Sequence, residues 1–182
     1  MKAGFEGGRK LSGRSRSRIR TSLITLCAAL LAGIAWVSYG GGGQGSITYT
    51  GKSGPVIMAV KNVYLVRGPD MAAGKVVRRL IFSTADLASK LKACQAMTCS
   101  DADLREGLAV DLDAGPRLNY WFVADNQKLQ FSGTSPPTAL RLTTDNPQRL
   151  TGQLAMDDST RGGPKTELQF DVAMTKEFTR WR

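Results

Sequence analysis

The segment Thr166–Met174, with the sequence TELQFDVAM, decides the fold class of this 182-residue chain. Its apolar residues Leu168, Phe170, Val172 and Met174 alternate with polar or small ones. A period of two places successive side chains on opposite faces of a β-strand. The segment therefore predicts a strand with one buried face and one face in water.

The same period recurs through the second half of the chain. Further alternating runs cover 108–113, 140–143 and 150–156. The runs 118–124 and 128–131 flank Asp125-Asn126, a turn signal, and so predict a hairpin. Turn-forming residues separate the runs at 51–55, 68–74, 133–137, 145–147 and 157–164. Short strands at this spacing predict a mostly β domain over 46–182, an antiparallel β-sandwich or barrel.

Two segments depart from this pattern. Residues 56–67 change phase near Lys61, which predicts a bulge or a strand covered on both faces. Residues 83–94 show helical spacing of their apolar positions, with Ser83 or Thr84 available as the N-cap. We therefore expect one small helical insert on the β scaffold.

Cys94 and Cys99 are the only cysteines after the first 40 residues. In an oxidising compartment we expect them to form a disulfide that links the helix to the next turn. Two such cysteines are too few for a zinc site, and the chain has no histidine. We therefore expect no metal and no cofactor.

The first 39 residues predict a membrane segment. Residues 1–20 carry seven basic residues and one acidic residue, which supplies +6 of the formal net charge of +10. Residues 21–39 contain no charge and as a helix reach about 28 Å, close to the thickness of a bilayer core. A basic leader before an apolar span follows the positive-inside rule. We expect a single-pass signal anchor in a bacterial inner membrane, with the leader cytoplasmic and the C-terminal domain periplasmic. The alternative is a cleaved signal peptide and a domain secreted to the periplasm.

The segment 40–45, with the sequence GGGGQG, predicts a flexible linker between the span and the domain. Because most of the excess positive charge precedes the apolar span, we do not expect the domain to bind nucleic acid.

Asp111 and Asp113 are two apart in a predicted strand, about 6.5–7 Å from each other on one face. Paired carboxylates can act as general acid and base, although a solvated polar face explains them equally well. Without histidine, Ser–His and Cys–His nucleophile pairs are excluded. We therefore do not expect an enzyme.

The C-terminus mixes aromatic and basic side chains, at Phe178, Arg180, Trp181 and Arg182. This mixture suits contact with a membrane headgroup layer or an acidic partner, and a frayed soluble tail is the alternative.

Three short runs suggest a family: Asn62–Arg67 (NVYLVR), Arg149–Leu154 (RLTGQL) and Leu168–Val172 (LQFDV). With these runs the chain resembles uncharacterised exported bacterial β-domains. The resemblance implies a fold for the exported part and no activity.

Together these features predict a non-enzymatic, membrane-anchored cell-envelope protein. Its membrane contact is residues 21–39, and its periplasmic β-domain binds another envelope component, expected to be a protein. One alternative is a carrier of a small apolar ligand or lipid inside the β-domain. The other is an unrecognised hydrolase that uses Asp111 and Asp113.

Overall fold

The computed structural model describes residues 41–51, 54–71 and 73–182. The predicted leader at 1–20 and the predicted span at 21–39 lie outside the described residues. Within the described ranges, no helix is both long enough and apolar enough to cross a membrane.

The described residues form strands with a few short helices. The strands are β1 (Gly41–Gly51), β2 (Gly54–Ala59), β3 (Asn62–Asp70), β4 (Lys75–Ser83), β5 (Gly107–Asp111), β6 (Leu118–Ala124), β7 (Leu129–Ser135), β8 (Leu140–Asn146), β9 (Arg149–Asp157) and β10 (Lys165–Glu177). The helices are α1 (Ala88–Ala93) and α2 (Cys99–Asp103), with 3-10 turns η1 (Pro137–Ala139) and η2 (Ser159–Arg161).

All ten strands belong to one sheet in the order β7-β6-β5-β4-β3-β1-β10-β9-β8, with β2 paired to β1. The neighbours pair antiparallel, apart from one added parallel pairing of β3 with β10. The mostly antiparallel β fold is therefore confirmed, and so is the β6–β7 hairpin. A closed barrel is wrong, because the terminal strands β7 and β8 do not pair and the sheet stays open.

The sheet curls around its main hydrophobic core. Strands from both halves contribute to this core, and two aromatic pairs join the halves directly. Tyr49 of β1 stacks on Phe122 of β6 at 5.3 Å between ring centroids. Phe82 of β4 meets Phe170 of β10 edge to face at 5.7 Å. The alternation seen in the sequence thus places Phe170 and its apolar neighbours inside, as predicted.

Two polar groups also join the halves where no strand pairing closes the sheet. Arg78 of β4 binds Asp113 through Nε at 2.8 Å, and its Nη1 binds Asp145 at the end of β8. In the second group, the Tyr120 hydroxyl and the Arg161 guanidinium both donate to Asp158. In a closed barrel, backbone hydrogen bonds between the terminal strands hold the sheet together. Here ion pairs and hydrogen bonds between side chains provide part of that attachment.

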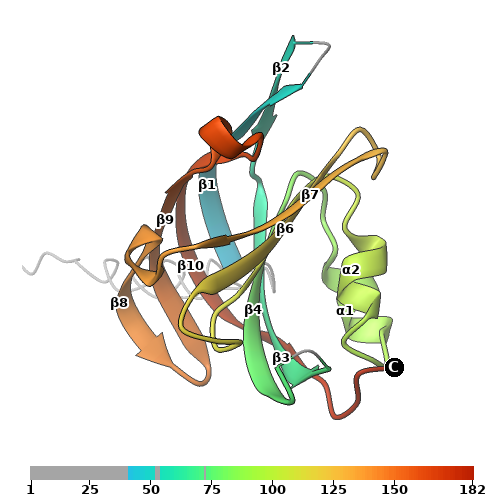
Figure 1. Cartoon of the computed structure of the whole chain (residues 1–182). Helices are drawn as coiled ribbons and strands as arrows, with labels where there is room; N and C mark the ends of the chain where they lie inside the picture. Colours follow the sequence, from blue (N-terminus) through green and yellow to red (C-terminus); the bar gives the residue numbers. More distant parts are fainter. Residues whose placement is uncertain (1–40, 52–53, 72) are drawn as a thin grey trace, which may run out of the picture. The chain divides into compact units, whose positions relative to one another are not determined.

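A second core lies on the outer face of β3 to β6. Helices α1 and α2 lie together on this side of the sheet, and the C-terminus lies beside α1 (Figure 1). Strand β3 faces both cores, since Val63 and Leu65 join the main core while Tyr64 and Val66 join the second. The prediction of a strand covered on both faces is correct for β3, which is separated from β2 by a break at residues 60–61.

The predicted flexible linker at 40–45 is wrong for its described part, because residues 41–45 are the first half of β1, where Gly41 pairs with β3 and residues 42–45 pair with β10. The glycines permit a close approach between β1 and β10. A Cβ on Gly41 would lie 2.6 Å from the Cβ of Val172. Gly45 has a φ of +129°, and a Cβ there would lie 2.0 Å from the Glu167 carbonyl oxygen. These positions use glycine for packing and backbone conformation.

The predicted helix is shorter than expected and uses no capping hydroxyl. Helix α1 begins at Ala88, and its N-cap residue Leu87 makes no side-chain capping bond. The nearby carboxylate of Asp86 accepts hydrogen bonds from the Ala88 N–H at 2.8 Å and from the Tyr64 hydroxyl at 2.6 Å. Asp86 therefore fixes the backbone where the chain enters α1. Ser83 and Thr84, the predicted N-cap residues, lie too far before Ala88 to cap the helix.

Candidate binding surfaces

The predicted disulfide is present between Cys94 and Cys99. It joins the residue after α1 to the first residue of α2, so it closes a small loop between the two helices. The prediction of a disulfide-linked helical insert is confirmed, with two short helices where the sequence indicated one helix and a turn.

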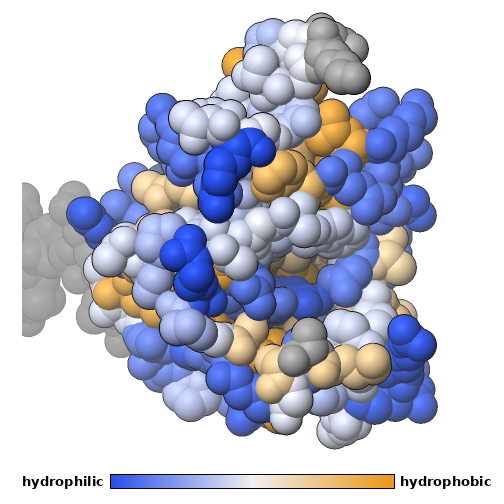
Figure 2. Space-filling view, viewed as in Figure 1, coloured by the Kyte–Doolittle hydropathy of each residue, from blue (hydrophilic) through white to orange (hydrophobic). Residues whose placement is uncertain are grey.

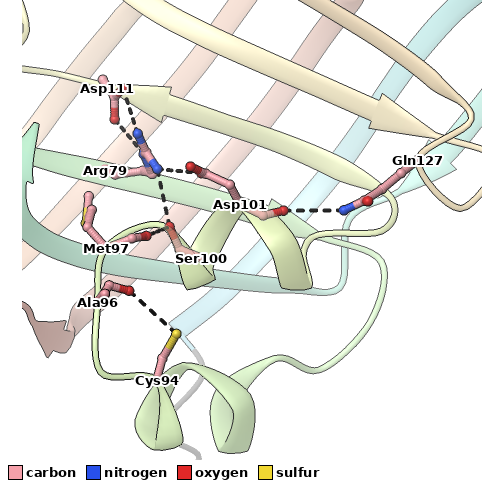
Figure 3. Close-up of polar contacts among 8 residues, drawn as sticks. All are labelled: Arg79, Cys94, Ala96, Met97, Ser100, Asp101, Asp111 and Gln127. Atoms are coloured by element: carbon pink, nitrogen blue, oxygen red, sulfur yellow. Dashed lines mark hydrogen bonds and ion pairs between the residues drawn. The ribbon is translucent and has the colours of Figure 1, made fainter. Parts of the chain in front are cut away.

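A buried arginine holds this insert on the sheet (Figure 3). Arg79 of β4 is 5 % exposed, and its Nε and Nη2 donate to the two carboxylate oxygens of Asp111 at 2.6 and 3.0 Å. Its Nη1 donates to Asp101 Oδ1 at 2.5 Å and to Ser100 Oγ at 3.2 Å. Ser100 and Asp101 belong to α2, so one guanidinium connects β4, β5 and the helical insert.

The cluster holds two carboxylates for one guanidinium. Burial by itself lowers the pKa of Arg79, but the hydrogen bonds and charges of Asp111 and Asp101 outweigh burial and raise it above its usual value. Burial raises the pKa of Asp101, and the positive charge of Arg79 opposes that rise. A cleft of about 300 Å³, lined in part by Asn119 and Trp121, opens beside the cluster.

A neighbouring side chain completes the attachment of α2. Gln127 lies in the β6–β7 turn with a φ of +69°. Its amide nitrogen donates to the carbonyl oxygens of Ala102 at 3.2 Å and Leu104 at 2.6 Å, at the C-terminal end of α2. These carbonyls have no partner inside the helix, so the amide acts as a C-terminal cap.

The structure does not bring Asp111 and Asp113 together as a carboxylate pair. Asp113 lies beyond the end of β5, and its carboxylate binds Arg78 at 2.8 and 3.1 Å. Arg78 and Arg79 are consecutive in β4 and point to opposite faces of the sheet. Each aspartate is therefore held by its own arginine, and the expectation that both project from one strand face is wrong.

The C-terminal residues are docked on the disulfide loop. The Met97 and Thr98 N–H groups donate to the carbonyls of Arg180 and Trp181, both at 3.1 Å. Arg180 Nε also donates to the Gln95 carbonyl at 3.1 Å. A frayed tail is thus not what the structure shows.

The four predicted contact residues at this end of the chain have different surroundings. Phe178 is 4 % exposed and belongs to the second core, which leaves it unable to meet a partner in this conformation. Trp181 packs partly against the same core. Arg180 and Arg182 are exposed. Only the basic members of the predicted contact set therefore face the solvent fully.

The β1–β2 hairpin presents the clearest unpaired strand edge. β2 pairs with β1 on one side and with no other described strand. The Val60 N–H donates to the Gly45 carbonyl at 3.1 Å, toward β1. Because N–H directions alternate along a strand, the backbone groups of Ile57 and Ala59 point to the free side. The side chains of Val56 and Ile57 are 38 % and 71 % exposed.

Figure 1 shows this hairpin projecting at the top of the view, and Figure 2 shows hydrophobic surface in the same upper region. The segment Gly54–Ala59 carries no charged side chain. Natural edge strands are commonly protected by charges, prolines or bulges, and β2 has only Pro55 at its start. We call the outward backbone of β2, with Val56 and Ile57, the free edge of β2.

The outer face of the other half of the sheet is polar. Across β1, β10 and β9, Gln44 is in register with Gln169, and Gln169 with Gln153. We call these three exposed residues the glutamine row. Sequence reasoning placed Gln169 on a wet face but did not find the row, because the register of three strands cannot be derived from alternation alone.

Among the described residues, no group of three or more histidine, cysteine or acidic side chains is placed to hold a metal ion. Comparisons with protein-family models, with curated proteins and with solved structures each found no significant match.

Proposed function

We propose that this chain is a membrane-anchored cell-envelope protein whose domain binds an extended segment of another envelope protein along the free edge of β2. The proposal keeps the periplasmic location and the anchor at 21–39 expected from the sequence. It treats the curled sheet, whose two halves pack face to face, as a sandwich-like scaffold without chemistry of its own.

The free edge of β2 carries this proposal. An extended segment that pairs with the outward N–H and C=O groups of Ile57 and Ala59 satisfies backbone groups that have no strand partner among the described residues. Apolar side chains of the segment would cover Ile57, the most exposed large apolar side chain in the described part of the chain. An uncharged, apolar segment therefore matches this edge best.

The other two edge strands suit a partner less well. β8 carries Arg141 and Asp145, charges of the kind that protect an edge from pairing. In β7 the apolar residues Leu129 and Phe131 already pack against the main core. Of the three edge strands, β2 is the one that combines a free backbone with exposed apolar side chains.

A photo-reactive amino acid at position 59, introduced in living cells, tests the proposal. We expect a covalent adduct with another envelope protein, and none from the same probe at Gln130 on β7. Ile57→Pro removes the outward N–H without touching the bonds to β1, so it should abolish the adduct, whereas Ile57→Thr keeps the N–H and should retain it. An adduct that persists in the Ile57→Pro chain, or its absence throughout, contradicts the proposal.

A further inference from the structure

The glutamine row lies on a sheet face that none of the described helices covers. Helices α1 and α2 cover β3 to β6, whereas the outward residues of β1, β10 and β9 are open. The register continues from Gln153 to Arg141 of β8. Residues in register on antiparallel strands point to the same face, about 4.8 Å apart from strand to strand. The three amides and Arg141 therefore form one line across four strands.

The three amides have no hydrogen-bond partner among the described residues. Gln127 and Gln130 of the β6–β7 hairpin differ in this respect. The Gln127 amide donates to the Leu104 carbonyl, and the Gln130 amide donates to the Gln127 carbonyl at 2.9 Å. A side-chain amide offers two donors and an accepting oxygen. The row thus presents repeated donors and acceptors that are available to a ligand.

Charged groups beside the row are neutralised within the domain. Arg149 binds the carboxylate of Asp171 through Nε at 2.7 Å and Nη2 at 2.6 Å. Lys165 Nζ lies 3.8 Å from Glu167 Oε1 and 3.9 Å from Asp157 Oδ2, so one lysine is shared by two carboxylates. The centre of the face is left uncharged, and Arg141, in line with it, has no ion-pair partner among the described residues. This balance favours a neutral, polar ligand over an acidic or basic one.

Hollows of about 440 and 570 Å³ lie on the two sides of the row, and all three glutamines line both of them. Gly42 contributes to the first hollow, because a Cβ at this position would meet nothing within 4 Å. A ligand laid along the row therefore has room for substituents on either side.

We propose that the glutamine row binds a neutral glycan chain that bears hydroxyl and acetamido groups and lies across the strands. The strand spacing presents one amide about every 4.8 Å, close to the length of one sugar ring in an extended β-linked chain. Hydroxyl and acetamido groups donate and accept hydrogen bonds, as the amides do, and bulky acetamido groups fit the hollows. This site is separate from the free edge of β2 and does not depend on a protein partner.

Calorimetric titration of the purified full-length chain with a β-linked N-acetylglucosamine oligosaccharide tests the proposal. We expect saturable binding that Gln169→Ala weakens roughly tenfold, because the central amide lies between two others and its loss removes more than one hydrogen bond to the ligand. Gln44→Ala and Gln153→Ala should weaken binding in the same direction.

Gln130→Ala is the matched control, since it removes an exposed glutamine from β7, and it should leave the affinity unchanged. The circular dichroism spectrum should be the same for every variant. Absence of binding overturns the proposal, and so does binding that Gln169→Ala leaves intact. Stronger binding of an acidic oligosaccharide, abolished by Arg141→Ala, overturns the assignment of a neutral ligand.

Discussion

Replacement of Arg79 by methionine tests whether the buried ion cluster holds the helical insert on the sheet. The Arg79 side chain is 7 % exposed, and the carboxylates of Asp111 and Asp101 that it binds are 16 % and 33 % exposed. Removal of one partner of a buried ion pair costs about 3–5 kcal/mol, because the remaining charge is left without compensation. Asp101 can turn partly toward water, so we expect a loss of about 3–4 kcal/mol.

Urea unfolding of the full-length chain, followed by tryptophan fluorescence, measures this loss. A typical domain has only about 5–15 kcal/mol of stability, so the transition midpoint should fall clearly. Arg149→Met is the matched control, because Arg149 binds Asp171 with the same two-pronged geometry at the surface. We expect it to leave the midpoint unchanged, since exposed ion pairs contribute little.

A double variant separates the unpaired charge from the lost packing. Arg79→Met combined with Asp111→Leu removes the buried carboxylate together with its partner, so it should recover much of the lost stability. If Arg79→Met shifts the midpoint no more than Arg149→Met does, the cluster does not anchor the insert and the reasoning is refuted.

Three further predictions concern Phe178 in the C-terminal tail, the disulfide, and the carboxylate of Asp158, which joins the two halves of the sheet. Phe178→Ala should destabilise the domain by about 3–5 kcal/mol because it leaves a cavity, while Arg182→Ala should have no effect. Equally small effects of the two substitutions in denaturant unfolding would contradict the burial of Phe178. Cys94→Ser with Cys99→Ser should speed hydrogen exchange at the Met97 and Thr98 amides, which bond to the tail, and unchanged protection in mass spectrometry would speak against that docking. Burial opposes ionisation of Asp158, but hydrogen bonds from Arg161 and Tyr120 outweigh it and lower its pKa. The stability from Asp158 is therefore present above its unfolded pKa of about 3.9 and lost as pH falls through the lower folded value. Asp158→Asn should reduce stability at pH 7 and flatten its decline toward pH 3, and unfolding curves with the wild-type slope would count against this.

Strands with one buried and one solvent-exposed face could be predicted from the sequence, because apolar and polar residues alternate along them. β10 and β9 belong to this class. β3 could be predicted only in part, since both of its faces are covered and alternation disappears. The adjacent residues Arg78 and Arg79 of β4 cannot be told apart from the sequence, yet Arg79 is buried. Its partner Asp111 is 32 positions away, and only the strand register brings the two together.

The candidate sites were harder to predict than the fold. The cysteine pair could be found because two cysteines in one domain leave a single pairing. The free edge of β2 could not be found from the sequence, because residues 56–67 looked like one strand. The break at 60–61 depends on how β2 and β3 diverge in the fold. The glycines of β1 indicated a linker, since the sequence does not show the close contact of Gly41 with Val172 that requires them.

We propose that residues 41–182 function outside the cytoplasm, and a reporter enzyme fused after Arg182 tests this proposal most directly. The reporter should be one that folds only in an oxidising compartment. The account predicts an active, full-length fusion in the cell envelope. An intact but inactive fusion recovered from the cytosol would contradict it, and with it both the anchor and the envelope partner.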